Sequence, residues 1–187
     1  PGNIKVSSDI LLISGSSPSL FNGSSGIFSA ASSIDPNSNS INPQINFDLS
    51  NNFTDSGNID ITAGSINLFD NGTISTQNDS NGNGGRIFIK ASDKLFLKDS
   101  FITASTQGGD GGTINITTTR LIAQNSLISA SAQGKGNGGN ISITSNVIFG
   151  DRNSYLRANA ENGRGGEITV NAKGFSFPRE NITAIST

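Results

Sequence analysis

Asp79 and Asp110 are the residues of this chain whose surroundings are most like a metal site. Each lies in a short stretch rich in glycine or asparagine, such as Gly-Gly-Asp-Gly-Gly around Asp110. Calcium takes several carboxylate and carbonyl oxygens from turns of this kind, so these two aspartates are candidate calcium ligands. The corresponding stretches later in the chain carry Asn137 and Arg164 instead of an aspartate. Because the carboxylate does not recur, we favour ordinary turns and expect no bound metal ion or other cofactor.

Polar residues beside the repeated isoleucines are the positions where catalytic groups would lie. Acid–base chemistry on a polysaccharide needs two carboxylates, or a carboxylate and a cationic group, held side by side. The candidate row comprises Asp60, Lys90, Asn115, Ser142 and Thr169. With one carboxylate in this row there is no pair, so we expect no catalytic residue and no enzyme. A polysaccharide-binding or polysaccharide-degrading β-helix remains an alternative.

Three phenylalanines are the candidate interaction surface. Phe88 and Phe96 each lie between two aliphatic residues, and Phe101 directly precedes Ile102. Successive side chains of a strand point to opposite faces, so inward aliphatic residues turn the neighbouring ring outward. Outward apolar rings indicate contact with another molecule or with another part of the chain. We expect the three rings to lie on different sides of the molecule.

The composition excludes several classes of protein. The chain has 187 residues, a net charge of −2, and no Cys, His, Met or Trp. It therefore lacks thiol chemistry and the usual ligands of zinc and copper, and no basic patch indicates nucleic-acid binding. No apolar run approaches the length of a membrane span, so we expect no membrane insertion. Because residue 1 is not methionine, we expect a processed chain or a piece of a longer protein.

A fixed repeat dominates the sequence from residue 57 onward. Glycine pairs recur at intervals of 27 residues, and an isoleucine stands two positions after each pair. A period in this range marks a repeat architecture whose units stack on one another. The corner glycines predicted by this pattern are Gly57, Gly84, Gly85, Gly111, Gly112, Gly138, Gly139, Gly165 and Gly166. We expect them to supply backbone angles that other residues avoid.

Each repeat contains three short strand signals. The first has the period-two alternation of a strand, as in Ile114 and Ile116, and a single aliphatic residue such as Ile128 marks the third. The second comprises the inward pairs Ile66/Leu68, Leu95/Leu97, Leu121/Ala123, Val147/Phe149 and Phe175/Phe177. Three strands per repeat predict an all-β fold, a right-handed parallel β-helix, that is, a three-sided β-solenoid of about six coils. A propeller, whose blades need about 40 residues or more, and a leucine-rich repeat fit less well.

We expect one β-solenoid domain over residues 1–187, with regular repeats over 57–187. Residues 1–56 span about two repeat lengths but carry one full set of strand signals, so we interpret them as a first coil with two insertions. The insertions are predicted at 14–25 and 33–56. Insertions leave a solenoid at its corners and often mark a binding face.

Asparagines that follow a corner glycine predict a polar ladder. Stacked Asn side chains hydrogen-bond along the axis of parallel strands. The row contains Asn3, Asn58 and Asn140 and is interrupted by Arg86, Thr113 and Glu167. We therefore expect a partial ladder.

Two segments carry a resemblance to a known family. Residues 136–144, Gly-Asn-Gly-Gly-Asn-Ile-Ser-Ile-Thr, and residues 126–132, Ser-Leu-Ile-Ser-Ala-Ser-Ala, resemble the repeats of filamentous haemagglutinin-like exoproteins of the cyanobacterial type. The resemblance covers nearly the whole chain and rests on a structural repeat. It implies the repeat shaft region of a two-partner secretion passenger, exported through an outer-membrane partner to the bacterial cell surface or beyond. It transfers no catalytic residue, because no motif here matches one.

These observations together predict a non-catalytic structural segment of a secreted bacterial surface exoprotein or adhesin. Its expected partners are surface glycans or other cells. Open parallel edges at both ends would pair with flanking solenoid coils or with further copies of the chain. An extracellular filament made by end-to-end stacking of copies is the alternative.

Overall fold

The computed structural model describes residues 2–14, 26–29 and 55–186, and both predicted insertions, at 14–25 and 33–56, fall largely outside these ranges. The described chain forms two parallel sheets of six strands each. The long sheet consists of β1 (Ile4–Ser14), β3 (Ile59–Phe69), β5 (Arg86–Lys98), β7 (Thr113–Gln124), β9 (Asn140–Gly150) and β11 (Glu167–Ser176). The short sheet consists of β2 (Gly26–Phe28), β4 (Thr73–Ser75), β6 (Phe101–Thr103), β8 (Leu127–Ser129), β10 (Tyr155–Arg157) and β12 (Ile182–Thr183). A 3-10 helix, η1 (Arg179–Asn181), precedes β12.

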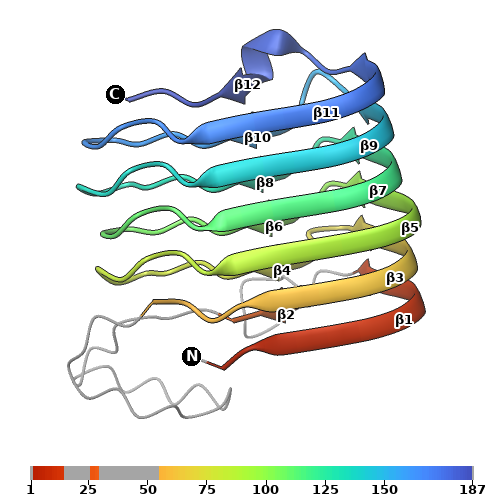
Figure 1. Ribbon diagram of the computed structural model, residues 1–187, viewed down its shortest axis with the longest axis horizontal. Helices are drawn as coiled ribbons and strands as arrows, with labels where there is room; N and C mark the ends of the chain where they lie inside the picture. The colour runs from red at the N-terminus through yellow and green to blue at the C-terminus, as the bar shows by residue number, and fades with distance from the viewer. Residues whose placement is uncertain (1, 15–25, 30–54, 187) are drawn as a thin grey trace.

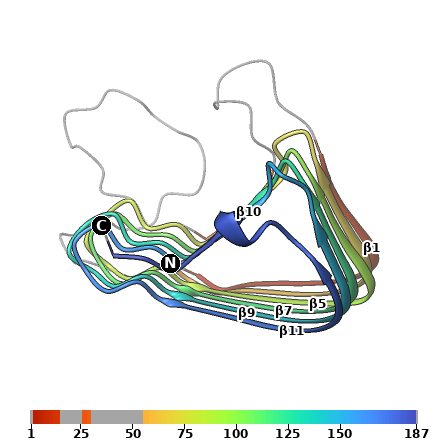
Figure 2. The same cartoon turned by 90° about the horizontal axis from the view of Figure 1, so that it is seen from above.

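The chain winds as a right-handed β-solenoid, which confirms the fold predicted from the glycine period. Each turn passes along a long strand, around a corner and back along a short strand, one level above the previous turn (Figure 1). Seen from the C-terminal end, the chain runs counter-clockwise as it approaches the viewer, which is the right-handed sense (Figure 2). The six rungs of each sheet correspond to about five turns.

Inward side chains form apolar columns along the axis of the stack. Equivalent residues of successive repeats pair directly, as Ile87 does with Ile114 and Ile114 with Ile141. The fully buried members of four columns are Ile59, Ile87, Ile114 and Ile141; Ile61, Ile89, Ile116 and Ile143; Ile66, Leu95, Leu121 and Ile148; and Ile74, Ile102, Ile128 and Leu156. Burial of each such side chain stabilises the fold by about 1.5–3 kcal/mol. These columns therefore provide most of the apolar stabilisation.

The solenoid has three sides, but two of them belong to one sheet. The first and second strand signals of each repeat form one long strand that bends in its middle, not two separate strands as the sequence suggested. The pairing of β3 with β5 shifts register between Ala63 and Ser65, and that of β5 with β7 shifts between Ala91 and Lys94. A bulge accommodates the extra residue of β5 at this point, whereas the other three pairings of the long sheet keep one offset throughout. Each long strand covers two sides and each short strand covers the third (Figure 2).

The corner glycines are required because of close backbone packing, and not because of the unusual backbone angles that we expected. None of the paired glycines has a φ between +20° and +160°. A Cβ built on Gly112 would lie 2.0 Å from the carbonyl oxygen of Gly85 in the preceding coil, and one on Gly139 would lie 1.9 Å from that of Gly112. Glycine is needed because two backbones approach too closely for any side chain.

Left-handed backbone occurs instead at the turns between the long and short strands. The residues with positive φ are Asp70, Asn71, Asp99 and Asn125, with φ values of 50°, 68°, 51° and 46°. Asn and Asp adopt this conformation more readily than other non-glycine residues because their short polar side chains bond to nearby groups. The expectation that glycines would supply these angles was therefore wrong.

The second strand signal was wrong in one repeat. Val147 and Phe149 point outward and are 49% and 43% exposed, whereas Ile148 between them is fully buried. Ile148 pairs with Leu121 on one side and Phe175 on the other. Each partner lies 27 residues from Ile148, so the repeat period holds through this strand. The predicted inward pair, Val147 and Phe149, did not follow this period.

Gly150 and Phe177 together complete the interior of the last two rungs. Gly150 pairs with inward Ala123 and so takes an interior position without filling it. The ring of Phe177, which is 8% exposed, occupies that space from the next rung. A Cβ on Gly150 would lie 2.2 Å from Cδ2 of this ring. The smallest residue of one coil is thus matched by a large one in the next.

We predict that Gly150→Ala lowers the free energy of unfolding by about 1–3 kcal/mol, the usual cost of overpacking. In a Phe177→Ala background the same change should cost much less, because the colliding ring is gone. Urea unfolding of the two single variants and the double variant measures this coupling. Gly174→Ala is the matched control, since its Cβ would meet its nearest atom at an ordinary 3.6 Å. An equal cost of Gly150→Ala with and without the Phe177 ring would contradict this packing.

Candidate interaction surfaces

Asp110 is a rung of a polar ladder along the glycine corner. Its carboxylate accepts hydrogen bonds from the backbone N–H of Asn137, at 2.7 Å, and from the Asn137 side-chain amide, at 3.1 Å. In the same way, the backbone N–H of Asp110 donates to the side-chain oxygen of Asn83 at 2.8 Å, and the N–H of Arg164 donates to that of Asn137 at 3.0 Å. Asp55 begins the series by accepting from the N–H of Asn83 at 2.8 Å. The role of Asp110 in the structure is therefore to hold one coil on the next.

The second candidate calcium ligand lies elsewhere in the corner. Asp79 accepts a hydrogen bond of 2.7 Å from the side-chain amide of Gln77. Within the described ranges, no three Asp, Glu, His or Cys side chains gather as a metal-binding group. The structure gives these two aspartates no shared site, and the absence of a metal ion stays a prediction.

The ladder predicted from Asn3 and Asn58 exists but is short. Asn3 accepts from the N–H of Asn58 at 2.9 Å, and Asn58 accepts from the N–H of Arg86 at 3.0 Å. The longer ladder of Asp55, Asn83, Asp110 and Asn137 was missed. Its signal was present, because an Asn or Asp directly precedes three successive glycine pairs.

The candidate catalytic row is divided between two columns. Asp60 shares a column with Phe88, Asn115, Ser142 and Thr169. Lys90 belongs to the neighbouring column, beside Thr62 and Thr117, so its inclusion in the row was wrong. The Asp60 carboxylate forms an ion pair with the guanidinium of Arg86 in the next coil, with 2.8 Å between Oδ1 and Nη2.

A second ion pair between coils lies at the bend of the long strands. The Asp93 carboxylate accepts from the Arg120 guanidinium and also from the Ser65 hydroxyl, at 3.1 Å. These hydrogen bonds, that from Arg120 first, hold the pKa of Asp93 below its usual value. Both members are about half exposed, so water screens the pair and its contribution to stability is small.

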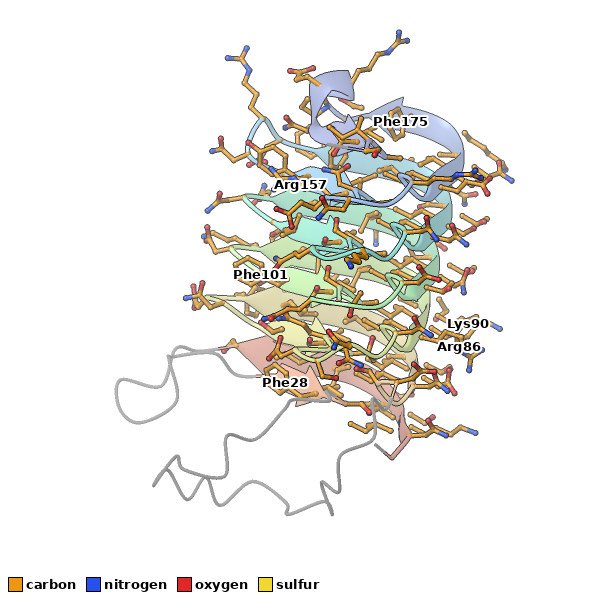
Figure 3. The ribbon with its side chains drawn as sticks, turned by 90° about the vertical axis from the view of Figure 1, so that its left-hand side faces the viewer. Phe28, Arg86, Lys90, Phe101, Arg157 and Phe175 are labelled. Atoms are coloured by element: carbon orange, nitrogen blue, oxygen red, sulfur yellow. The ribbon has the colours of Figure 1, made fainter. Side chains whose placement is uncertain are left out.

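The three candidate phenylalanines all point outward, on different sides. Phe88 and Phe96 are half-buried on the two halves of β5, and the ring of Phe96 meets that of Phe69 edge-on, with centroids 6.0 Å apart. Phe101 is 36% exposed on the short sheet. Figure 3 shows Phe28, Phe101 and Arg157 on one side of the stack, away from Arg86 and Lys90. These rings therefore do not form one patch.

An apolar stripe runs across the outer face of the long sheet beyond its bend. We define the apolar stripe as Phe96, Ile122 and Phe149, which follow one another in one outward column, with Val147 in the adjacent column. Leu12 and Ile10 begin these two columns on the first rung, but Asn67 separates Leu12 from Phe96, and Ser65, Lys94 and Arg120 separate Ile10 from Val147. Ile10, Leu12, Val147 and Phe149 are exposed, and Phe96 and Ile122 are half-buried. Only Phe96 was identified from sequence, because Val147 and Phe149 were expected to be inward.

Comparisons with known proteins give no further identification. No protein-family model, no curated protein and no solved structure matches the chain. The described part of the chain contains no helix with the length and apolar character needed to cross a membrane.

Proposed function

We propose that this chain is a structural segment of a bacterial surface exoprotein, acting as a rigid, non-catalytic shaft. The observation that supports this most strongly is how its polar groups are used. Side chains at the glycine corner, at the bend and at the strand turns bond from one coil to the next, and not towards a common centre. A chain built in this way gains length and stiffness with each added repeat.

Buried serines give a further example of bonding between coils. The backbone N–H of Ser100 donates to the hydroxyl oxygen of Ser126 at 3.2 Å, and the N–H of Ser126 donates to that of Ser154 at 3.3 Å. The hydroxyls of Ser100 and Ser126 in turn donate to the carbonyls of Lys98 and Gln124. Buried polar groups that satisfy one another in this way fix a single register between coils.

The resemblance to filamentous haemagglutinin-like exoproteins adds the cellular setting. A passenger of that type leaves the cell through an outer-membrane partner and stands on the cell surface, where it contacts glycans or other cells. The shaft proposed here would hold the contacting region away from the membrane. The exposed apolar stripe supports lateral contact between such shafts, because outward apolar surface favours association.

An antibody raised against this chain should label intact cells of the bacterium that encodes it, because a surface shaft is accessible from outside. External protease should remove the label. An abundant cytoplasmic protein of the same cells is the control and must stay unlabelled until lysis. Labelling that requires lysis would contradict a surface location and with it the proposed function.

End-to-end stacking into a filament is a second candidate, favoured by the open C-terminal rung. Phe175 is 46% exposed on this rung, whereas its partner Ile148 one rung below is fully buried. Ile168 and Val170 are only half-buried, whereas their partners Ile141 and Ile143 one rung below are buried. β11 and β12 also end their sheets, so among the described strands nothing pairs with their outer edges. Another set of rungs would cover all of these groups.

If copies stack, the purified chain should form fibres in negative-stain electron microscopy, with a repeat near the length of six rungs, about 30 Å. The double substitution Phe175→Lys with Val170→Lys should abolish them, because it places two charges on inward positions of the last rung, at the joint. Val147→Lys is the control, since Val147 is similarly exposed, at 49%, but lies on the side of the stack. Absence of fibres in the unchanged chain, or their persistence in the double variant, would rule out this second candidate.

A further inference from the structure

A groove lies between the short sheet and the turns that lead into it. We call it the ridge groove; it has a volume of about 270 Å³ and is lined by Asn71, Asp99, Phe101, Asn125, Ser126, Leu127, Asn153, Tyr155 and Arg157. Seven of these nine residues come from two positions that recur in successive repeats, and Ser126 and Arg157 come from positions next to them in the chain. The groove therefore runs along the axis of the solenoid and crosses several rungs.

The floor of the ridge groove is apolar. Phe101, Leu127 and Tyr155 occupy one outward column of the short sheet, because Phe101 pairs with Leu127 and Leu127 with Tyr155. Parallel strands lie about 4.8 Å apart, so these side chains cover roughly 10 Å along the axis. The Arg157 guanidinium lies over one face of the Tyr155 ring, 4.4 Å from its centroid, in a cation–π contact at one end of the floor.

The wall of the ridge groove is polar. Asn71, Asp99 and Asn125 stand at the turns with left-handed backbone, and all three residues line the groove. The Asn125 amide donates to the Asp99 carboxylate at 2.6 Å, which holds these two groups in a fixed arrangement. The side chains of Asn71 and Asn153 make no hydrogen bond to other described residues. The wall thus offers amide donors and amide and carboxylate acceptors beside the apolar floor.

The chemistry of floor and wall fits a sugar better than other ligands. A pyranose ring has an apolar C–H face that packs on aromatic and aliphatic side chains, and hydroxyl pairs at its edge that exchange hydrogen bonds with amides and carboxylates. A nucleic acid would need an excess of cations, whereas Arg157 and Asp99 leave the lining without net charge. The absence of net charge also favours a neutral ligand, and the axial run of the floor favours an extended chain.

We propose that the ridge groove binds an extended strand of neutral polysaccharide. The sugar rings would lie on Phe101, Leu127 and Tyr155, and the hydroxyl groups would bond to Asn71, Asp99, Asn125 and Asn153. The proposal of a polysaccharide site goes beyond the proposed role as a structural shaft, because it assigns a ligand to one side of the solenoid. Glycan binding by this groove and a location on the cell surface do not require each other, so the two proposals are tested separately.

Affinity electrophoresis of the whole chain through gels containing xylan, mixed-linkage β-glucan or dextran tests the proposal, with alginate as an acidic comparison. At least one neutral polysaccharide should retard the unchanged chain. Tyr155→Ala should weaken that binding about tenfold, since it removes one stacking surface of the floor. Asn153→Ala should weaken it less. Phe88→Ala is the matched control, because it removes a half-buried outward ring from another side, and it should leave the affinity unchanged.

Circular dichroism and thermal unfolding of each variant show whether the fold is kept, so that a loss of binding is assigned to the groove. Three outcomes would overturn the proposal. The first is no retardation by any neutral polysaccharide. The second is equal retardation of the unchanged chain and a folded Tyr155→Ala variant. The third is retardation by alginate alone that disappears with added salt. None of these outcomes bears on whether the chain reaches the cell surface, which the antibody labelling decides independently.

Discussion

The close approach of two backbone segments at each glycine pair is the constraint on which the solenoid depends. The N–H groups of Gly112, Gly139 and Gly166 donate across their own coils to the carbonyls of Ala104, Ala130 and Ala158, at 2.7, 2.6 and 2.7 Å. The same glycines stack so tightly on the coil below that no Cβ fits. Each coil is thereby closed at one end by backbone alone, and its aliphatic side chains gather in the wider part.

Because every coil repeats this closure, chemical variety is confined to outward positions and turns. An outward position recurs at every rung, so a substitution in successive repeats creates a column of related side chains, not an isolated residue. The apolar stripe arises in this way on the long sheet, and the floor of the ridge groove arises in the same way on the short sheet. A fold of this type therefore forms binding surfaces as axial stripes and grooves, which suit long or repetitive partners.

The sequence predicted the coil, its period and most of the inward columns, because the glycine pairs and the alternation of Ile114 and Ile116 each have one structural interpretation. It failed at Val147-Ile148-Phe149, where three successive apolar residues make alternation ambiguous. There the pairing of Ile148 with inward Leu121, 27 residues earlier, makes Ile148 the inward residue. The ridge groove was not predicted beyond Phe101, because its wall depends on left-handed turns at Asp99 and Asn125, which the glycine pattern does not reveal.

Hydrogen exchange of the glycine amides tests the central claim most directly. If the coils close through bonds from Gly112, Gly139 and Gly166 to the opposite carbonyls, these amides should exchange as slowly as those of Ile114 and Ile141 in the neighbouring strands. Amides in an ordinary exposed loop exchange quickly. Rapid exchange at all three glycines, with Ile114 and Ile141 still protected, would show that the coils are not closed at these positions and would contradict the account.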